Sequence, residues 1–152
     1  MEKNHGHKEL IQKIIKDNPD CDYYFHTGDS MLEEEDIFPF ESVNGNCDEM
    51  FDYPDERLYE LCGHKILLFH GTNQAAFDIA LSEYAKSRKA DIVFYGHTHR
   101  FRDEIYDNIH FINPGSCYKS RNLNSLSYAL VNLSDDETVE VNMITMDEGQ
   151  MG

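Results

Sequence analysis

Short apolar segments of this 152-residue chain run repeatedly into small clusters of glycine and polar side chains. Each cluster follows a segment that predicts a strand, and ligand-binding loops of open α/β sheets lie at that end of their strands. We therefore expect the clusters to lie together along one rim of a sheet, although they are far apart in sequence. The clusters are Gly28-Asp29, Gly45-Asn46-Cys47-Asp48, His70-Gly71 and Gly96-His97-Thr98-His99.

Strands and helices are mixed in the predicted secondary structure, with several strands toward the end of the chain. Apolar residues at helical spacing predict helices over 7–18 and 75–86. The pair Asp107-Asn108 predicts a tight hairpin turn. This mixture favours an α/β layered sandwich over an all-helical or all-β fold. The second helix is predicted to place Ala76, Ile79, Ala80 and Tyr84 on one face. Strands are predicted over 23–25, 40–43, 57–61, 65–69, 91–95, 104–106, 109–112, 126–133 and 138–144.

The chain is strongly acidic, with a formal net charge of −16 at pH 7 when histidine is neutral. Such a field repels nucleic-acid backbones, so we expect no general binding of DNA or RNA. It does not exclude a phosphate ester, because bound divalent cations would reverse the sign of the charge locally. The simpler alternative is that the acidic surface keeps the protein soluble.

The sequence carries no pattern typical of membrane insertion or secretion. No segment approaches the roughly 18 consecutive apolar residues that a membrane-spanning helix needs. The polar start over 1–7 lacks the apolar core of a signal peptide. We therefore expect a protein that does not bind membranes. Because the cysteines show no CxxC spacing and no signal peptide is visible, we expect reduced thiols in the cytoplasm. The cysteines are Cys21, Cys47, Cys62 and Cys117.

The residue types in the clusters are those that bind metal ions. The carboxylate of Asp29 can bridge two ions, and Asn46 offers a neutral amide oxygen. Imidazoles, the commonest metal ligands, come from His70, His97 and His99. Mixed nitrogen and oxygen ligands suit Mn, Fe, Zn, Ni or Co better than Ca or Mg alone.

Taken singly, each cluster has an ordinary structural explanation. Gly28-Asp29 is a common turn, and a single histidine after a strand carries little information. Two histidines at i and i+2 after an apolar strand, as in His97 and His99, are seldom core residues. The ordered set is more specific than any of its members.

The order of the clusters, followed by Asn113-Pro114-Gly115-Ser116, resembles the calcineurin-like metallophosphoesterases. The likeness is greatest to their small bacterial and archaeal phosphodiesterase branch, and it extends from about His5 to the final strands. It implies a single domain over 1–152 with two packed β-sheets flanked by helices, a four-layer αββα arrangement. It also implies metal-dependent hydrolysis of small phosphate esters, most specifically phosphodiesters.

The same resemblance assigns roles to individual residues. Asp29 would bridge two divalent ions. His5 and His99 would bind one of these ions, and a separate set of ligands would bind the other. Mn²⁺ is the expected metal, with Ni²⁺, Fe²⁺, Zn²⁺, Co²⁺ and Mg²⁺ as alternatives. Hydrolysis would proceed by in-line attack of a metal-activated hydroxide on phosphorus. The ligands of the other site, which with Asp29 form the catalytic set, are Asn46, His70 and His97.

Three further residues are candidates for substrate binding. Cys47 stands where many phosphatases of the family place a histidine thought to help the leaving group, and a thiol there is typical of the small phosphodiesterase branch. A buried, inert thiol is an equally good interpretation. Lys119 and Arg121 follow the Asn-Pro-Gly-Ser turn and could hold a substrate phosphate. Ordinary surface charge is the alternative for both.

The start of the chain departs from the family pattern. The family opens with an apolar strand ending in Asp-x-His, whereas this chain has Lys3 in the carboxylate position and His5 in the histidine position. We expect a domain that lacks its first strand, derived from an active two-metal phosphodiesterase. The alternatives are a non-catalytic binding module, for which the retromer sorting subunit of this fold is a precedent, and a hydrolase with one metal. An exposed sheet edge would also allow a homodimer.

Overall fold

The computed structural model describes residues 11–27, 37–44, 53–71, 78–96, 101–115, 126–134 and 138–146. A helix covers residues 11–17 and agrees with the prediction over this part. Every predicted strand is present, with bounds that differ by a few residues. The other elements are β1 (Tyr24–His26), β2 (Phe40–Ser42), β3 (Glu56–Leu61), β4 (His64–Phe69), α3 (Asp78–Ser87), β5 (Ile92–Phe94), β6 (Phe101–Tyr106), β7 (Ile109–Pro114), β8 (Leu126–Leu133) and β9 (Val139–Met146).

The strands form a five-stranded sheet and two smaller pairs. The large sheet has the order β3-β4-β5-β7-β6, with β4, β5 and β7 parallel and the two outer strands antiparallel to their neighbours. Strands β1 and β2 pair in parallel, and β8 and β9 pair antiparallel. The parallel arrangement of β4, β5 and β7 brings their C-terminal ends to one edge of the large sheet.

Two tight turns lie at the opposite edge. Cys62 and Gly63 join β3 to β4 with φ values of 50° and 81°, and Asp107 and Asn108 join β6 to β7 with φ values of 55° and 63°. Two consecutive residues with positive φ define the type I′ turn, whose twist matches that of the flanking strands. The hairpin predicted from Asp107-Asn108 is therefore confirmed. His64, which lies between the strands predicted over 57–61 and 65–69, begins β4.

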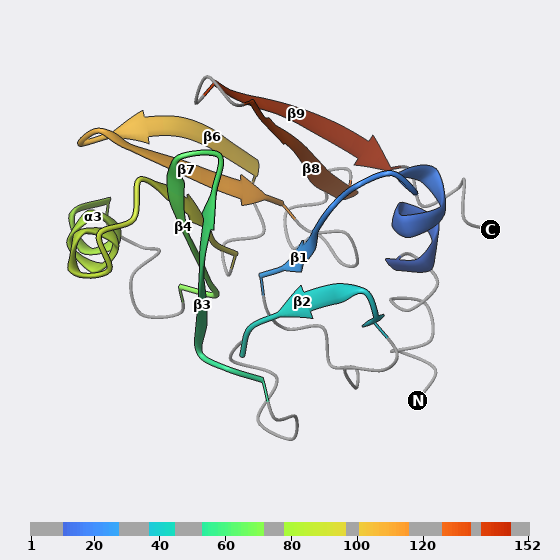
Figure 1. Cartoon of the computed structure of the whole chain (residues 1–152), viewed down its shortest axis with the longest axis horizontal. Helices are drawn as coiled ribbons and strands as arrows, with labels where there is room; N and C mark the ends of the chain where they lie inside the picture. Colours follow the sequence, from blue (N-terminus) through green and yellow to red (C-terminus); the bar gives the residue numbers. More distant parts are fainter. Residues whose placement is uncertain are drawn as a thin grey trace.

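Helix α3 covers one face of the large sheet (Figure 1). Leu81 and Ala85 are fully buried there, whereas Ile79 is 64% exposed. Ile79, which was predicted to share a face with Ala80 and Tyr84, is therefore not part of the packed face, and Ala76 lies outside the described residues. The helix is oriented by the aromatic ring of Tyr84, which stacks on Phe69 with centroids 4.8 Å apart, and this orientation turns Ile79 outward. The core on this side consists of Leu67, Phe69, Leu81, Ala85, Ala90, Val93, Tyr95, Ile109 and Phe111.

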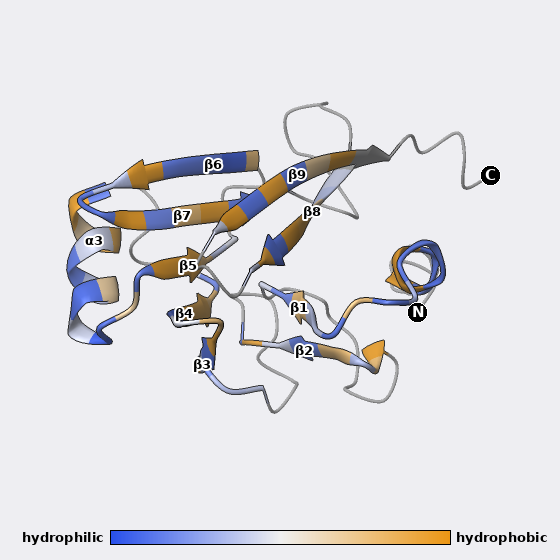
Figure 2. Cartoon of the chain, turned by 45° about the horizontal axis from the view of Figure 1, so that its top comes forward, coloured by the Kyte–Doolittle hydropathy of each residue, from blue (hydrophilic) through white to orange (hydrophobic). Residues whose placement is uncertain are grey.

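The two smaller pairs of strands cover the other face, as Figure 2 shows. Phe25 of β1 lies 5.7 Å from Phe94 of β5 between ring centroids, so β1 contributes directly to this second core. Val131 and Val141 contribute from β8 and β9. The helix over 11–17 packs on the outer side of β2 through Ile11, next to Ile37, Tyr53 and Phe40. The mixed α/β fold and its helix–sheet–sheet–helix layering are confirmed.

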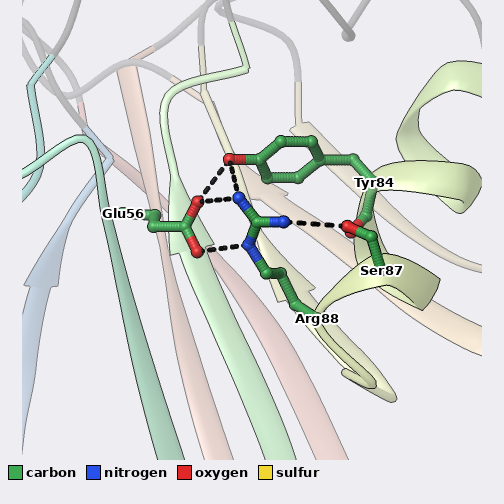
Figure 3. Close-up of polar contacts among 4 residues, drawn as sticks. All are labelled: Glu56, Tyr84, Ser87 and Arg88. Atoms are coloured by element: carbon green, nitrogen blue, oxygen red, sulfur yellow. Dashed lines mark hydrogen bonds and ion pairs between the residues drawn. The ribbon is translucent and has the colours of Figure 1, made fainter.

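A polar cluster fastens α3 to β3 (Figure 3). The guanidinium of Arg88 donates to both carboxylate oxygens of Glu56, with its Nε 2.6 Å from Oε2 and its Nη2 2.9 Å from Oε1. The hydroxyl of Tyr84 also donates to Glu56, and Arg88 lies 4.5 Å from the centre of the Tyr84 ring. Ser87 accepts a further bond from Arg88 at 3.0 Å.

In this cluster, the pKa values of the Glu56 carboxylate and the Tyr84 hydroxyl shift in opposite directions. Hydrogen bonding to Arg88 lowers the pKa of Glu56, while burial, followed by the bond to Glu56, raises the pKa of the Tyr84 hydroxyl. Both shifts favour an ionised Glu56 carboxylate and a neutral Tyr84 hydroxyl at neutral pH. Because the pKa of the carboxylate is lowered, its stabilising contribution is present above the ordinary pKa and is lost as the pH falls through the lowered value.

The described residues also bear on two simpler expectations. Cys21 and Cys62 are free, exposed thiols, while Cys47 and Cys117 lie outside the described ranges. Among the helices of the described part, none is long and apolar enough to cross a membrane.

Candidate metal centre

Four segments that are distant in sequence meet at the C-terminal edge of the large sheet. Thr27 directly follows β1, and His70 directly follows β4. Gly96 lies in the loop after β5, and Asn113 lies at the end of β7. The Nδ1 of His70 lies 2.7 Å from the carbonyl oxygen of Thr27. The backbone N–H of Gly96 donates to the carbonyl of His70 at 3.1 Å. Of the predicted clusters, His70-Gly71 and the first residue of Gly96-His97-Thr98-His99 therefore lie side by side at this edge, and the other members lie outside the described residues.

His70 has the burial and orientation expected of a metal ligand. Its residue is only 4% exposed. Because a carbonyl oxygen can only accept, the bond to Thr27 places the imidazole proton on Nδ1. In the neutral ring the lone pair is then on Nε2. Metal-ligating histidines almost always donate their other N–H to a carbonyl or carboxylate, which fixes the tautomer and the orientation of the ring. His70 meets this requirement.

Two glycines shape the backbone next to His70. Gly71 has a φ of 84°, a conformation in which a side chain would be strained, so glycine is required immediately after the histidine. Gly96 is required for a different reason. A Cβ placed on it would lie 2.5 Å from Oγ1 and 3.1 Å from Cβ of Thr27. The absence of a side chain therefore allows the loop after β5 to approach the end of β1.

Replacing Gly96 by alanine should destabilise the fold, because the new methyl group overlaps the side chain of Thr27. We expect a loss of about 1–3 kcal/mol in the free energy of unfolding, the usual cost of an overpacked site. Urea denaturation of Gly96→Ala, Thr27→Ala and the double variant forms a complete thermodynamic cycle. The double variant should recover part of the loss, since it removes Oγ1. Strictly additive effects of the two changes would contradict the proposed overlap.

Most of the predicted site residues lie outside the described ranges. Within the described part of the chain, no three His, Cys, Asp or Glu side chains form a possible metal site. Of the candidate ligands, only His70 belongs to that part. Thr27 directly precedes the cluster Gly28-Asp29, and Gly96 is the first residue of the cluster Gly96-His97-Thr98-His99. The predicted residues outside the described ranges are His5, Asp29, Asn46, Cys47, His97, His99, Lys119 and Arg121.

Two other histidines lie at the opposite edge, each within hydrogen-bond distance of a carboxylate. Nδ1 of His64 is 2.6 Å from Asp91, and Nε2 of His110 is 2.5 Å from Asp103. Each begins or nearly begins a parallel strand of the large sheet, β4 or β7, so both lie away from the C-terminal edge. Neither belongs to the predicted set of metal ligands.

Sequence reasoning missed three groups that support the site edge. The carbonyl of Thr27 orients His70, and the side chain of Asn113 donates to the carbonyl of Gly96 at 3.1 Å. Arg102 joins the first turn of α3 to the residue before Gly96, with Nη1 2.9 Å from Asp78 and 3.2 Å from the Tyr95 hydroxyl. The position of Thr27 directly before Gly28-Asp29 was an available signal, whereas nothing local in the sequence marks Arg102.

Comparison with known proteins places the chain in a family. The model of the calcineurin-like phosphoesterase superfamily domain matches residues 4–136. The chain is 34% identical over 138 residues to the probable metallophosphoesterase YsnB of Bacillus subtilis, covering 88% of this chain and 82% of that protein. The crystal structure of a predicted phosphoesterase from Streptococcus pneumoniae superposes with a TM-score of 0.72 at 27% identity, covering 93% and 92% of the two chains.

Two more distant structures share the fold. Vps29 of Entamoeba histolytica, solved as a zinc complex, has a TM-score of 0.69 at 21% identity and covers 88% of each chain. A structure described as a novel archaeal phosphodiesterase has a TM-score of 0.65 at 22% identity, covering 93% of this chain and 95% of that one. At these identities the likeness concerns the fold alone. Together, the domain match, the B. subtilis relative and the arrangement around His70 establish that the chain belongs to the calcineurin-like phosphoesterase superfamily.

Proposed function

We propose that this protein hydrolyses small phosphodiesters at a centre of two divalent metal ions. Membership of a phosphoesterase superfamily supports the reaction class. The observation that carries the proposal is His70, a buried imidazole whose Nδ1–H is held by the carbonyl of Thr27 at the edge where the predicted clusters begin. Beside it, Gly71 has a φ of 84° and Gly96 donates its N–H to the carbonyl of His70, so the backbone around the imidazole is fixed at this edge.

The donor set fits divalent metal ions. His5 and His99 would hold one ion, Asp29 would bridge, and the remaining ligands would be Asn46, His70 and His97. Bound cations would lower the pKa of a water molecule and neutralise charge on the phosphoryl oxygens. We propose Mn²⁺ as the metal, because imidazole, amide and carboxylate ligands together suit it. The residues of the chain would orient the ligands and exclude competing solvent.

The charge of the chain is compatible with this substrate class. A net charge of −16 would repel a phosphate ester at long range, and the cations would reverse that repulsion within the site. A small substrate needs only this local field, whereas a nucleic acid would meet the acidic surface over a long stretch. We propose a small phosphate ester as the partner and expect neither nucleic acid nor membrane binding.

A non-catalytic binding module on the same fold is the second candidate. Lys3 stands in the position where the family pattern has aspartate, and an ammonium group there would repel a cation from one of the two metal sites. Vps29, which shares the fold, is a zinc-binding protein in its crystal structure. A centre with one metal ion and reduced activity lies between the two candidates.

Hydrolysis of bis-p-nitrophenyl phosphate by the 152-residue chain tests the proposal. We expect turnover with Mn²⁺ that EDTA abolishes and excess Mn²⁺ restores. Asp29→Asn should lower it by at least about 100-fold, since a change that only reorients a ligand already costs about 10- to 100-fold. The control is Asp107→Asn, the same change in the β6–β7 turn at the other edge of the sheet, where Asp107 pairs with Lys86.

The outcomes separate the candidates. Turnover that requires Mn²⁺ and Asp29 but not Asp107 supports the phosphodiesterase. A folded chain that binds Mn²⁺ without hydrolysing the ester supports the binding module and contradicts the proposal. Turnover that EDTA leaves unchanged contradicts any metal-dependent mechanism.

A further inference from the structure

Asn113, the first residue of the Asn-Pro-Gly-Ser turn, supports the site edge through its side chain but is not one of the candidate ligands. It is fully buried, with 0% of the residue exposed. Its side chain is used at both ends. Oδ1 accepts from the backbone N–H of Gly115 at 3.0 Å, and Nδ2 donates to the carbonyl oxygen of Gly96 at 3.1 Å. A buried amide must be satisfied in this way, because an unpaired polar group costs about 1–3 kcal/mol.

The bond to Gly115 explains the turn but not the choice of asparagine. A side-chain oxygen that accepts from the N–H two residues later forms an Asx-turn, which aspartate or serine also forms. The turn has a second support from β8, where the hydroxyl of Ser127 donates to the carbonyl of Pro114 at 2.8 Å. Gly115, with a φ of 79°, supplies the backbone conformation. None of these features requires an amide nitrogen.

The bond to Gly96 is the one that only the amide supplies. It joins residues 17 positions apart and connects the end of β7 to the loop after β5. The carbonyl of Gly96 belongs to the peptide unit that links it to His97, so the bond fixes the orientation of that peptide plane. On its other side, Gly96 donates its N–H to the carbonyl of His70. The residue before His97 is therefore held from both neighbouring strands.

We infer that Asn113 is a positioning residue for metal binding. It fixes the backbone from which His97 extends and, through Gly96, keeps that backbone in register with His70. The inference rests on the proposed function, in which both histidines are metal ligands. Groups that orient ligands without touching the metal commonly change its affinity by about 10- to 100-fold when they are removed.

The test is Mn²⁺ binding by Asn113→Ser, measured by isothermal titration calorimetry at constant pH. Serine keeps a hydroxyl for the turn but is too short to reach the carbonyl of Gly96. We expect about 10- to 100-fold weaker Mn²⁺ binding by a chain that still unfolds cooperatively in urea. Asn142→Ser is the matched control, because Asn142 lies on β9 and its amide contacts only the exposed Glu140, at 3.5 Å, among the hydrogen bonds of the described part. A purely structural role for Asn113 would lower the urea midpoint and leave the Mn²⁺ affinity of the folded chain unchanged.

The result that overturns the inference is a folded Asn113→Ser chain whose Mn²⁺ affinity stays within about twofold of wild type. If that variant does not fold, Asn113→Asp is measured in its place, since it keeps the volume and the turn but lacks the N–H donor.

If neither variant folds, NMR measurement of the solvent exchange of the Asn113 side-chain amide in the wild-type protein tests the inference. The exchange should slow when diamagnetic Zn²⁺ is added, and unchanged exchange overturns the inference. A wild-type chain that binds neither ion overturns the proposed function as well, whereas equal binding by wild type and variant overturns the inference alone.

Discussion

His70→Gln should remove metal-dependent hydrolysis almost completely. We expect a fall of at least about 100-fold in kcat/KM with Mn²⁺, since losing a ligand costs more than disturbing the groups that orient one. Glutamine is polar and close in volume, so the buried position remains filled. The carbonyl of Thr27 at 2.7 Å can still accept a hydrogen bond from the new amide. The change therefore removes the imidazole with little disturbance of the fold.

The matched control is His110→Gln. His110 pairs with Asp103 near the start of β7, at the edge of the sheet away from the candidate site. It should keep its Mn²⁺-dependent kcat/KM within a few-fold of wild type, because it lies at the edge of the sheet away from the candidate site. Steady-state kinetics with bis-p-nitrophenyl phosphate and Mn²⁺ titrations on all three proteins make the comparison. Equal activity of His70→Gln and His110→Gln would remove His70 from the site.

Phe111→Ala should cause the largest loss of stability. Phe111 is 0% exposed in β7 and packs beneath α3 with Leu67 and Val93, so truncation leaves a cavity that the sheet cannot close. Buried phenylalanine-to-alanine changes cost about 3–5 kcal/mol. Since a domain of this size is usually stable by only about 5–15 kcal/mol, the variant should unfold at a much lower urea concentration.

Ile105→Ala provides the comparison for this core variant. Ile105 lies in the neighbouring strand β6 and is 71% exposed, so its truncation should cost no more than about 0.5 kcal/mol. Urea denaturation monitored by circular dichroism measures both. A Phe111→Ala midpoint close to that of Ile105→Ala would show that α3 does not seal this face of the sheet.

Local patterns in the sequence were enough to predict the strands and hairpins. Asp107-Asn108 predicted a turn because both residues tolerate positive φ, and the structure has them at 55° and 63°. The buried face of α3 could not be found in the same way. Its amphipathicity is weak, and the contact that orients it, Tyr84 on Phe69, joins it to a strand earlier in the chain. Periodicity placed Ile79 on one face with Tyr84, but it could not show which residues of that face contact the sheet.

The candidate site shows the same limit. His70 could be predicted because it follows an apolar strand and precedes a glycine. Its hydrogen-bond acceptor could not, because a backbone carbonyl has no signature in sequence and Thr27 is 43 residues away. Asn113 was recognisable as part of a motif, but its bond to Gly96 depends on β5 and β7 being neighbours. Residue types indicate the chemistry, whereas the pairing of strands determines which groups support it.

The division of the large sheet into packed faces and a polar edge bears on how this family can diversify. Both cores lie on the faces, beneath α3 on one side and beneath β1, β8 and β9 on the other. His70, the candidate ligand that the structure describes, lies at the edge and belongs to neither core. A change of ligand at such an edge position can therefore alter the chemistry while both cores stay packed. Lineages can thus acquire new specificities, or lose catalysis and keep a docking surface, on an unchanged framework.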